Sequence, residues 1–154
     1  AWIKHHTLLL ELRHSAHPRR LKIEIRRKMK PCDYQEKIAF SRFSARQVVL
    51  KAHTLEQAMK NKVAALLDRT EIRDAFDIEF LLRRGVPLPE LDAAALRRLR
   101  AGLDLFKDRD FAVTLGSILE NDMRDYYVSQ KFAFLTEKIS MALAAPKMGS
   151  NLDL

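Results

Sequence analysis

Apolar residues alternate with polar ones in the N-terminal part of the chain, and they recur at helical spacing in the remainder. In the segment LKIEIRRK, Leu21, Ile23 and Ile25 alternate with charged residues, which is the period-2 pattern of a half-buried strand. A hairpin connection is predicted at residues 14–20, and a loop at residues 30–36. The predicted strands are residues 7–13, 21–28, 37–43 and 47–53.

From Thr54 onward, the apolar residues have the three- and four-residue spacing of helices. Thr54 and Gln57 suit a capping box, in which Thr54 accepts from the Gln57 amide and the Gln57 side chain reaches back. Gly85, followed by Pro87, ends the second helix. The first helix has one apolar stripe, formed by Leu55, Ala58, Met59, Val63 and Leu66. The predicted helices are residues 55–68, 71–84, 92–103, 108–119 and 121–144.

Strands followed by a block of helices are typical of the α+β class. We expect a small antiparallel sheet of three or four strands, followed by a bundle of about five helices. The corresponding domains are a strand-rich segment at residues 1–53, a helical domain at residues 54–145 and a frayed tail at residues 146–154.

Four charged residues of the first two helices lie where apolar residues are expected. At about 100° per residue, Lys62 falls inside the apolar stripe, and Arg69 follows two turns later at nearly the same angle. On the second helix, Asp74 and Asp77 share a face with apolar residues. Charges turned toward a core are costly unless they are paired or face a cleft.

These charged residues have both a functional and a structural interpretation. Lys62 and Arg69 are separated by about 10 Å along the helix axis, which suits two cations that grip different phosphates of one nucleotide. Alternatively, Lys62 extends past the edge of the core with its stem packed. Asp74 and Asp77 suit a general base, a metal ligand or orienting partners of the cations. The structural alternative is a helix-dipole contact for Asp74 and an ion pair between helices.

The net charge of +8 is concentrated between Arg13 and Arg46. One interpretation is a patch for polyanions such as RNA or nucleotide phosphates, and the other is the solvated face of a basic protein. No apolar run reaches the roughly 18 residues that a membrane span needs, and the N-terminus lacks a secretory signal pattern, which favours the cytoplasm. Cys32 is the single cysteine, which excludes an internal disulfide and a cysteine-based zinc site.

Glu24 lies on a predicted strand between Lys22 and Arg26. A carboxylate that projects from a strand has a geometry used to hold Mg²⁺ in phosphoryl chemistry. The more economical interpretation of Glu24 by itself is a cross-strand salt bridge with a basic neighbour. The histidines lack helical metal-ligand spacing, and the chain has neither a Gly-x-Ser-x-Gly nor a Walker-type loop.

The segment KNKVAALLDRTEIRDAFDIEFLLRRG resembles the signature A-E-K-hhAhhxR-x-x-x-RDhaDhxxLL of the AbiEii/AbiGii family of nucleotidyltransferase toxins, in which h is an apolar residue. Upstream, LKIEI is similar to the strand on which the polymerase-β-like nucleotidyltransferase superfamily carries its third, metal-associated carboxylate, here Glu24. Lys60 and Asn61 stand in place of the usual Ala-Glu. The charged positions of the signature are matched by Lys62, Arg69, Arg73, Asp74 and Asp77.

The resemblance implies transfer of a nucleotidyl group from an NTP to an acceptor such as RNA, by a toxin of a toxin–antitoxin or phage-defence system. Its implied partners are the NTP, a possible RNA acceptor and a possible cognate antitoxin, with no membrane. Residues 1–53 then correspond to the strand-rich remainder of a nucleotidyltransferase-like core. In this scheme Glu24 is a ligand of Mg²⁺.

The resemblance also implies roles for the residues of the helix pair. Lys62, Arg69 and Arg73 bind the nucleotide, with the first two on the triphosphate. Asp74 positions Lys62 or acts as a base, so that Asp74 and Lys62 are the catalytic candidates. Asp77 locks the two helices together.

In the family, a Gly-Ser loop and an Asp-x-Asp motif precede the third carboxylate, and this chain has no such element before Glu24. The Gly-Ser at residues 116–117 and the Asp-x-Asp at residues 108–110 come in the wrong order, so neither qualifies. We therefore expect either the C-terminal part of a longer protein or a remnant without the metal pair. One carboxylate does not support two-metal phosphoryl transfer, so the chain alone is predicted to be catalytically silent.

Two other hypotheses compete with the nucleotidyltransferase interpretation. The first is a non-catalytic module that binds RNA or a cognate antitoxin. The second is that Lys62, Arg69, Asp74 and Asp77 form only an ion-pair network that holds two helices together.

Overall fold

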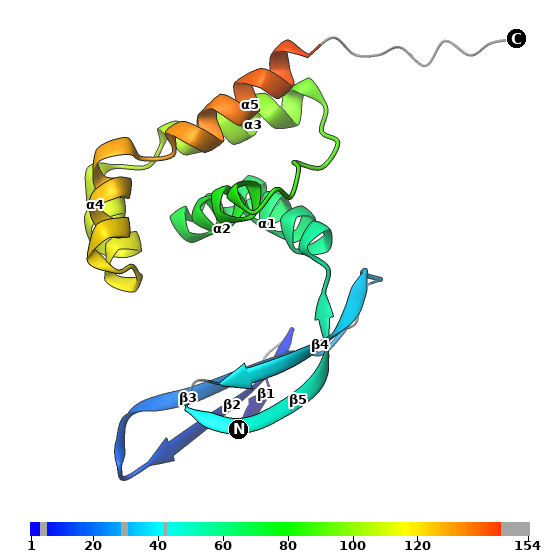
Figure 1. Cartoon of the computed structure of the whole chain (residues 1–154), viewed down its shortest axis with the longest axis vertical. Helices are drawn as coiled ribbons and strands as arrows, with labels where there is room; N and C mark the ends of the chain where they lie inside the picture. Colours follow the sequence, from blue (N-terminus) through cyan, green and yellow to red (C-terminus); the bar gives the residue numbers. More distant parts are fainter. Residues whose placement is uncertain (4–5, 29–30, 42, 146–154) are drawn as a thin grey trace, which may run out of the picture. The chain divides into compact units, whose positions relative to one another are not determined.

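The computed structural model describes residues 1–3, 6–28, 31–41 and 43–145, so the predicted frayed tail at residues 146–154 lies outside the described residues. Contacts along the chain group it into two compact units, Ala1–Cys32 and Asp33–Leu154. Strands come first and helices follow, as Figure 1 shows, which confirms the α+β class.

The first unit is a three-stranded antiparallel sheet with the order β1-β2-β3. Leu8 pairs with Ile25 and Leu10 with Ile23, so the apolar residues of β2 and β3 share one face. The expected half-burial of this face is wrong, because every residue of β3 is exposed. The physical reason is that the helices and strands described within residues 1–32 are all strands of this one sheet, so the unit supplies no second layer of its own. The strands are β1 Trp2–Ile3, β2 Thr7–His14 and β3 His17–Arg26.

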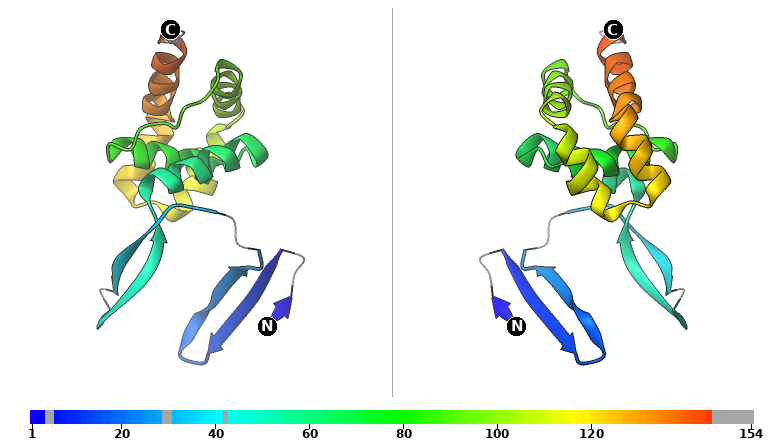
Figure 2. Two further views of the ribbon diagram at one scale, coloured as in Figure 1. Left: turned by 90° about the vertical axis from the view of Figure 1, so that its right-hand side faces the viewer. Right: turned by 90° about the vertical axis from the view of Figure 1, so that its left-hand side faces the viewer.

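The second unit begins with a hairpin of two antiparallel strands, β4 Tyr34–Ser41 and β5 Ser44–His53. The predicted loop at residues 30–36 therefore ends early, where β4 begins. The four predicted strands are present together with the short β1, and the described residues divide them into two sheets instead of one. Figure 2 shows that β5 runs directly into the first helix.

The junction between β5 and the first helix is held by hydrogen bonds around Thr54. The Thr54 hydroxyl accepts from the Gln57 amide at 3.1 Å, which confirms the first half of the predicted capping box. The second half is wrong, because the Gln57 side chain accepts from Asp33 N at 3.1 Å instead of reaching back. The Thr54 amide donates to the Asp33 carbonyl at 3.2 Å, so it has a partner without Gln57. Asp33 thereby ties the start of the hairpin to the helix.

The helical part contains the predicted helices with two differences. The segment predicted as a helix at residues 108–119 is mainly a π-helix followed by a 3-10 helix. The segment predicted as a single helix at residues 121–144 is two helices, separated at Lys131, which has a positive φ of 53°. No glycine or proline marks this break in the sequence. The change of direction at the break lets Phe132 and Leu135 enter the core. The helices are α1 Leu55–Arg69, α2 Ile72–Arg83, α3 Ala93–Asp104, the π-helical η1 Asp110–Leu115, the 3-10 helix η2 Gly116–Ile118, α4 Asn121–Gln130 and α5 Ala133–Ala144.

The core of the molecule is formed by its helices. The α1 stripe is buried at Met59, Val63 and Leu66, and it packs against α2 and α3. The helices α3 and α5 lie side by side (Figure 1). The buried charged residues of the described chain are Asp74 and Glu79, both on α2.

Candidate functional site

Asp74 is the centre of a cluster of charges between α1 and α2. Its side chain is 1% exposed, and it accepts hydrogen bonds from both cations of α1. Lys62 Nζ lies 3.2 Å from Asp74 Oδ1. Arg69 makes a two-pronged contact, with Nε 2.8 Å from Oδ2 and Nη2 3.0 Å from Oδ1. Lys62, Arg69 and Asp74, the charged residues predicted to interrupt apolar faces, are therefore paired with one another.

Two further carboxylates lie at the rim of this cluster. Lys62 Nζ is 2.5 Å from Asp77 Oδ2, one turn further along α2. Arg69 Nε is 3.8 Å from Glu71 Oε1. The cations keep contact with solvent, because 36% of the Lys62 side chain and 51% of the Arg69 side chain are exposed.

A very short connection brings Arg69 and Asp74 together. Helix α1 ends at Arg69, and Thr70 adopts the left-handed conformation with φ of 51° and ψ of 51°. This conformation reverses the chain, so that α2 begins at Ile72. For a β-branched residue such as threonine it is a strained conformation, which glycine or asparagine adopts more easily. The tight turn at Thr70 therefore places Arg69 at the end of α1 close to Asp74 at the start of α2.

The cluster keeps its ions charged. Burial alone would raise the pKa of Asp74, but the hydrogen bonds and charges of Arg69 and Lys62 outweigh it and lower that pKa. Burial opposes the charge on Lys62, and the contacts with Asp77 and Asp74 outweigh it and raise the pKa of Lys62. The hydrogen bonds with Asp74 raise the pKa of Arg69. Asp74 is thus a weak base in this geometry, suited to holding the two cations in place.

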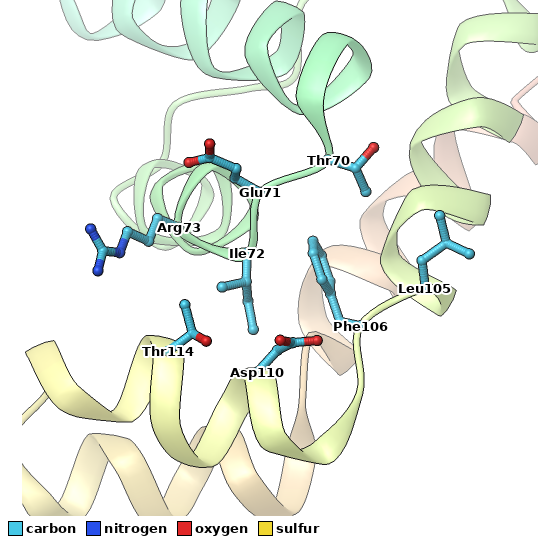
Figure 3. Close-up of a pocket in the computed structure, with 8 residues that line it drawn as sticks. All are labelled: Thr70, Glu71, Ile72, Arg73, Leu105, Phe106, Asp110 and Thr114. Atoms are coloured by element: carbon cyan, nitrogen blue, oxygen red, sulfur yellow. The ribbon is translucent and has the colours of Figure 1, made fainter.

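Arg73 lies outside this cluster, in a pocket of about 480 Å³ that it shares with residues from three other parts of the helical unit. Figure 3 shows its side chain at one side of this pocket, across from Leu105 and Phe106. The pocket is lined by Thr70, Glu71, Ile72, Arg73, Leu105, Phe106, Asp110 and Thr114. Of the predicted nucleotide-binding residues, the structure therefore brings Lys62 and Arg69 together and sets Arg73 on a neighbouring surface.

Glu24 lies on β3, in the first unit, where it pairs in register with Leu9. The described residues contain no group of three or more histidine, cysteine, aspartate or glutamate side chains arranged to hold a metal ion. One carboxylate between basic neighbours does not make the oxygen-ligand set that Mg²⁺ requires. The assignment of Glu24 to a metal stays a prediction.

Glu79 is a second buried charged residue, and it is not among the site residues predicted from the sequence. Its Oε1 accepts from Arg83 Nη2 at 3.0 Å and from the Tyr127 hydroxyl at 3.2 Å, and its Oε2 accepts from Leu135 N at 3.0 Å. The signal was present in the sequence, because Glu79 follows Ile72 by seven residues and so lies on the same apolar face of α2. This network joins α2 to α4 and α5 and is structural.

Comparison with known proteins identifies the class to which this charged helix pair belongs. A family model described as "Nucleotidyl transferase AbiEii toxin, Type IV TA system" matches residues 4–146, nearly the whole chain. The protein is therefore a nucleotidyltransferase-like toxin of the type found in toxin–antitoxin systems. It belongs to the AbiEii family. No curated protein and no solved structure matches the chain.

The match has consequences for the resemblance noted in the sequence. It confirms the AbiEii assignment and leaves the polymerase-β-like superfamily and the C-terminal placement as predictions. None of the described helices combines the length and the apolar character that a membrane span requires.

Proposed function

We propose that the cluster between α1 and α2 binds the triphosphate of an NTP, as part of a nucleotidyltransferase-type toxin. The observation that carries this proposal is the pairing of one buried carboxylate, Asp74, with two partly exposed cations, Lys62 and Arg69. Asp74 fixes both side chains before a ligand arrives, so little conformational entropy is lost on binding. The family of the chain supports a nucleotide as the ligand.

Both cations keep donors for phosphate oxygens. Arg69 uses Nε and Nη2 for Asp74, so Nη1 remains available. Lys62 has three N–H donors, of which one points to Asp74 and one to Asp77. Asp77 is 39% exposed, so a phosphate competes for Lys62 by replacing Asp77, while Asp74 stays in place.

We assign the carboxylates the following roles. Asp74 is a positioning residue and not a base, because its lowered pKa makes it a poor proton acceptor. Asp77 holds the two helices together when no phosphate is bound. Transfer of the nucleotidyl group to an acceptor, with Mg²⁺ on Glu24, would need further carboxylates. Nucleotide binding is therefore the property to measure on this chain.

Substitution of Lys62 separates this function from a purely structural ion pair. We expect Lys62→Ala to weaken NTP binding about tenfold or more, which is the magnitude of a lost hydrogen bond between charged groups. The free energy of unfolding should change by less than about 1 kcal/mol, because Lys62 is partly exposed and Arg69 still neutralises Asp74. Equilibrium dialysis with radiolabelled NTP, together with urea unfolding, measures both quantities.

The matched control is Lys60→Ala, since Lys60 lies on the same helix and its pair with Asp33 is a surface contact of 3.9 Å. It should leave NTP binding unchanged. If Lys62→Ala instead costs more than about 2 kcal/mol of stability and binds NTP normally, the cluster is only a structural network.

A second candidate function is binding of RNA or of a cognate antitoxin by the first unit. The observation that favours RNA is β3, whose residues are all exposed and include Arg19, Arg20, Lys22 and Arg26. Such a row of cations suits the phosphates of a nucleic acid, which need not be the acceptor of a transfer reaction.

A further inference from the structure

Two irregularities of the backbone meet at the pocket between the α1–α2 connection and η1. Thr70 has a positive φ of 51°, which is rare for a β-branched residue. On the opposite side, Asp110 and Thr114 belong to the π-helical segment η1. Segments of π-helix and strained residues occur often at functional sites. Their convergence on one cavity of about 480 Å³, a size that suits a small ligand, indicates a binding site.

The lining of this pocket combines a flat apolar part with carboxylates. Ile72, Leu105 and Phe106 supply the apolar part (Figure 3). Phe106 is held in position by edge-type contacts with two buried rings, Phe111 at 6.4 Å and Phe132 at 6.0 Å between ring centroids. A half-buried, fixed ring of this kind suits stacking with a planar heterocycle.

The carboxylates of the pocket accept hydrogen bonds. Asp110 Oδ2 accepts from Lys107 N at 2.8 Å, and within the described part of the chain no donor is bonded to Oδ1. Glu71 lies at the opposite edge of the pocket, and its carboxylate points away from Asp110 and Phe106, with Oε1 3.8 Å from Arg69 Nε. Thr70 and Thr114 add hydroxyl groups. Acceptors around a flat apolar wall match a ring that carries N–H₂ donors on its edge.

We propose that this pocket binds a nucleobase with an exocyclic amino group, that is adenine, guanine or cytosine. The base stacks on Phe106 and donates its amino group to Asp110, as carboxylates accept from the amino group of cytosine in nucleic-acid recognition. Uracil has no amino group and would turn a carbonyl oxygen toward a carboxylate. Arg73 at the side of the pocket is placed to meet the attached phosphate.

This base does not belong to a nucleotide held by Lys62 and Asp77. Ile72, which lines the pocket, precedes Asp74 by two residues, so the two side chains lie about 200° apart around α2. The pocket therefore lies beside the charged cluster, on another side of α2 and with Glu71 at the border of both, and a base bound in it does not require a phosphate on Lys62. The base belongs either to a free nucleotide or to a single RNA strand, and both share the chemistry that the pocket recognises.

Titration calorimetry of the full chain with AMP, GMP, CMP and UMP tests the proposal. We expect at least one of the three amino-bearing nucleotides to bind about tenfold more tightly than UMP. Phe106→Leu keeps an apolar side chain and removes the stacking face, and Asp110→Asn keeps an acceptor for Lys107 N. Each substitution should weaken the affinity for the amino-bearing nucleotide about tenfold. Circular dichroism melts confirm that the variants are folded.

Matched controls are Phe80→Leu, an exposed phenylalanine of α2, and Asp122→Asn, an exposed aspartate of α4. Both should bind as the unaltered protein does. The proposal is overturned if no nucleotide binds, if UMP binds equally well, or if the Phe106 and Asp110 variants bind normally.

Tetranucleotides of a single base distinguish the two sources of the nucleobase. Binding more than tenfold tighter than that of the monophosphate, and sensitive to Phe106→Leu, assigns the pocket to an RNA strand. Equal affinities assign it to a free nucleotide. The Lys62→Ala variant should bind these probes with unchanged affinity. The experiments can therefore reject the triphosphate site and the nucleobase pocket independently of each other.

Discussion

Asp74 is the residue on which the charged cluster depends. Its carboxylate is buried, yet it stays ionised because two cations donate to it from the end and the middle of α1. Removal of either cation leaves the other as a partner, whereas removal of the carboxylate leaves two neighbouring cations facing each other. The cluster should therefore be more sensitive to changes at Asp74 than at Lys62 or Arg69.

The lowered pKa of Asp74 makes part of the stability depend on pH. A carboxyl whose pKa is lower in the folded than in the unfolded state stabilises the fold above its ordinary pKa, near 3.8. This stabilisation is lost as the pH falls through the lower, folded value. We expect Asp74→Asn to be destabilised by about 2 kcal/mol at pH 7, and this difference to shrink steadily below about pH 4.

Urea unfolding of both proteins from pH 7 to pH 2 measures this difference. If the free energies of unfolding of the two proteins differ by the same amount at every pH, the charge of Asp74 does not contribute to the pH dependence of stability. The control is Asp125→Asn, a change of an exposed aspartate in the middle of α4, and its free energy of unfolding should stay within about 0.5 kcal/mol of that of the unaltered protein.

Glu79 is predicted to be the charged residue whose loss costs the most stability. It is completely buried and accepts from Arg83, the Tyr127 hydroxyl and the Leu135 amide. Glu79→Ala leaves a buried amide and a buried hydroxyl without a partner, so we expect a loss of about 3–5 kcal/mol. Glu79→Gln keeps an acceptor and should cost less. Urea unfolding measures the loss, with the exposed Glu137→Ala as the control.

A cost for Glu79→Ala no larger than that of the control would contradict this role. The network would then be incidental to the packing of α2 against the last two helices.

At the scale of elements, the two ends of α2 are determined in different ways. Its start depends on the strained turn at Thr70, and its end on Gly85, which has a φ of 84° and donates to the Leu82 carbonyl at 2.9 Å. Glycine adopts this conformation without a steric penalty. Gly85 marks the end of α2 in the sequence. No single residue marks its start, which lies inside the segment that resembles the family signature.

Two glycine substitutions should have opposite effects. Gly85→Ala is expected to destabilise the fold by about 1 kcal/mol, because alanine is strained at positive φ although no atom lies within 4 Å of the added methyl group. Gly102→Ala, within α3, places its methyl group 3.7 Å from Thr70 Cγ2, an ordinary contact, and should stabilise by about 0.5–1 kcal/mol. Thermal unfolding of the pair compares them directly, and a shift in the same direction would contradict the argument.

The whole molecule combines a basic strand unit with a helical unit that holds the core. The buried apolar residues of the described chain all lie between Met59 and Ile139, so stability resides in the helices. Among the residues of the first unit that the structure describes, none is buried, and the cations of β3 are exposed.

If β3 binds RNA, its affinity must depend steeply on salt. Lys22 and Arg26 lie on the same face of β3, paired in register with Glu11 and Thr7. For single strands, each phosphate contact contributes about 0.7 to the slope of log affinity against log salt. The double substitution Lys22→Gln with Arg26→Gln should therefore reduce the slope by about 1.4.

Fluorescence anisotropy of a labelled single-stranded RNA over a series of salt concentrations measures this slope. The control carries the same loss of charge in the helical unit, at the exposed residues Arg97 and Arg109, both changed to Gln. An equal effect of the two double variants would show that only the net charge matters and that β3 is not the surface.

Much of the fold and part of the candidate site could be predicted from the sequence. The period-2 and helical patterns placed the strands and helices, the cap at Thr54 was predicted from residue types, and the charged positions in apolar faces pointed to Lys62 and Asp74. These features depend on local geometry, in which a few neighbouring residues decide the outcome. The functional roles of the charged residues stay predictions.

Only the tertiary structure decided the remainder. The strands divide into two sheets, α4 and α5 separate at Lys131 without a breaker residue, and Glu79 finds the amide of Leu135 far along the chain. The pocket likewise joins Thr70 to Phe106. Each of these features depends on which distant segments meet. The free energy of such contacts cannot be predicted from the local residue pattern of one segment. The sequence by itself determined where charge interrupts the apolar faces, and the packing of the helices determined which partner each charge found.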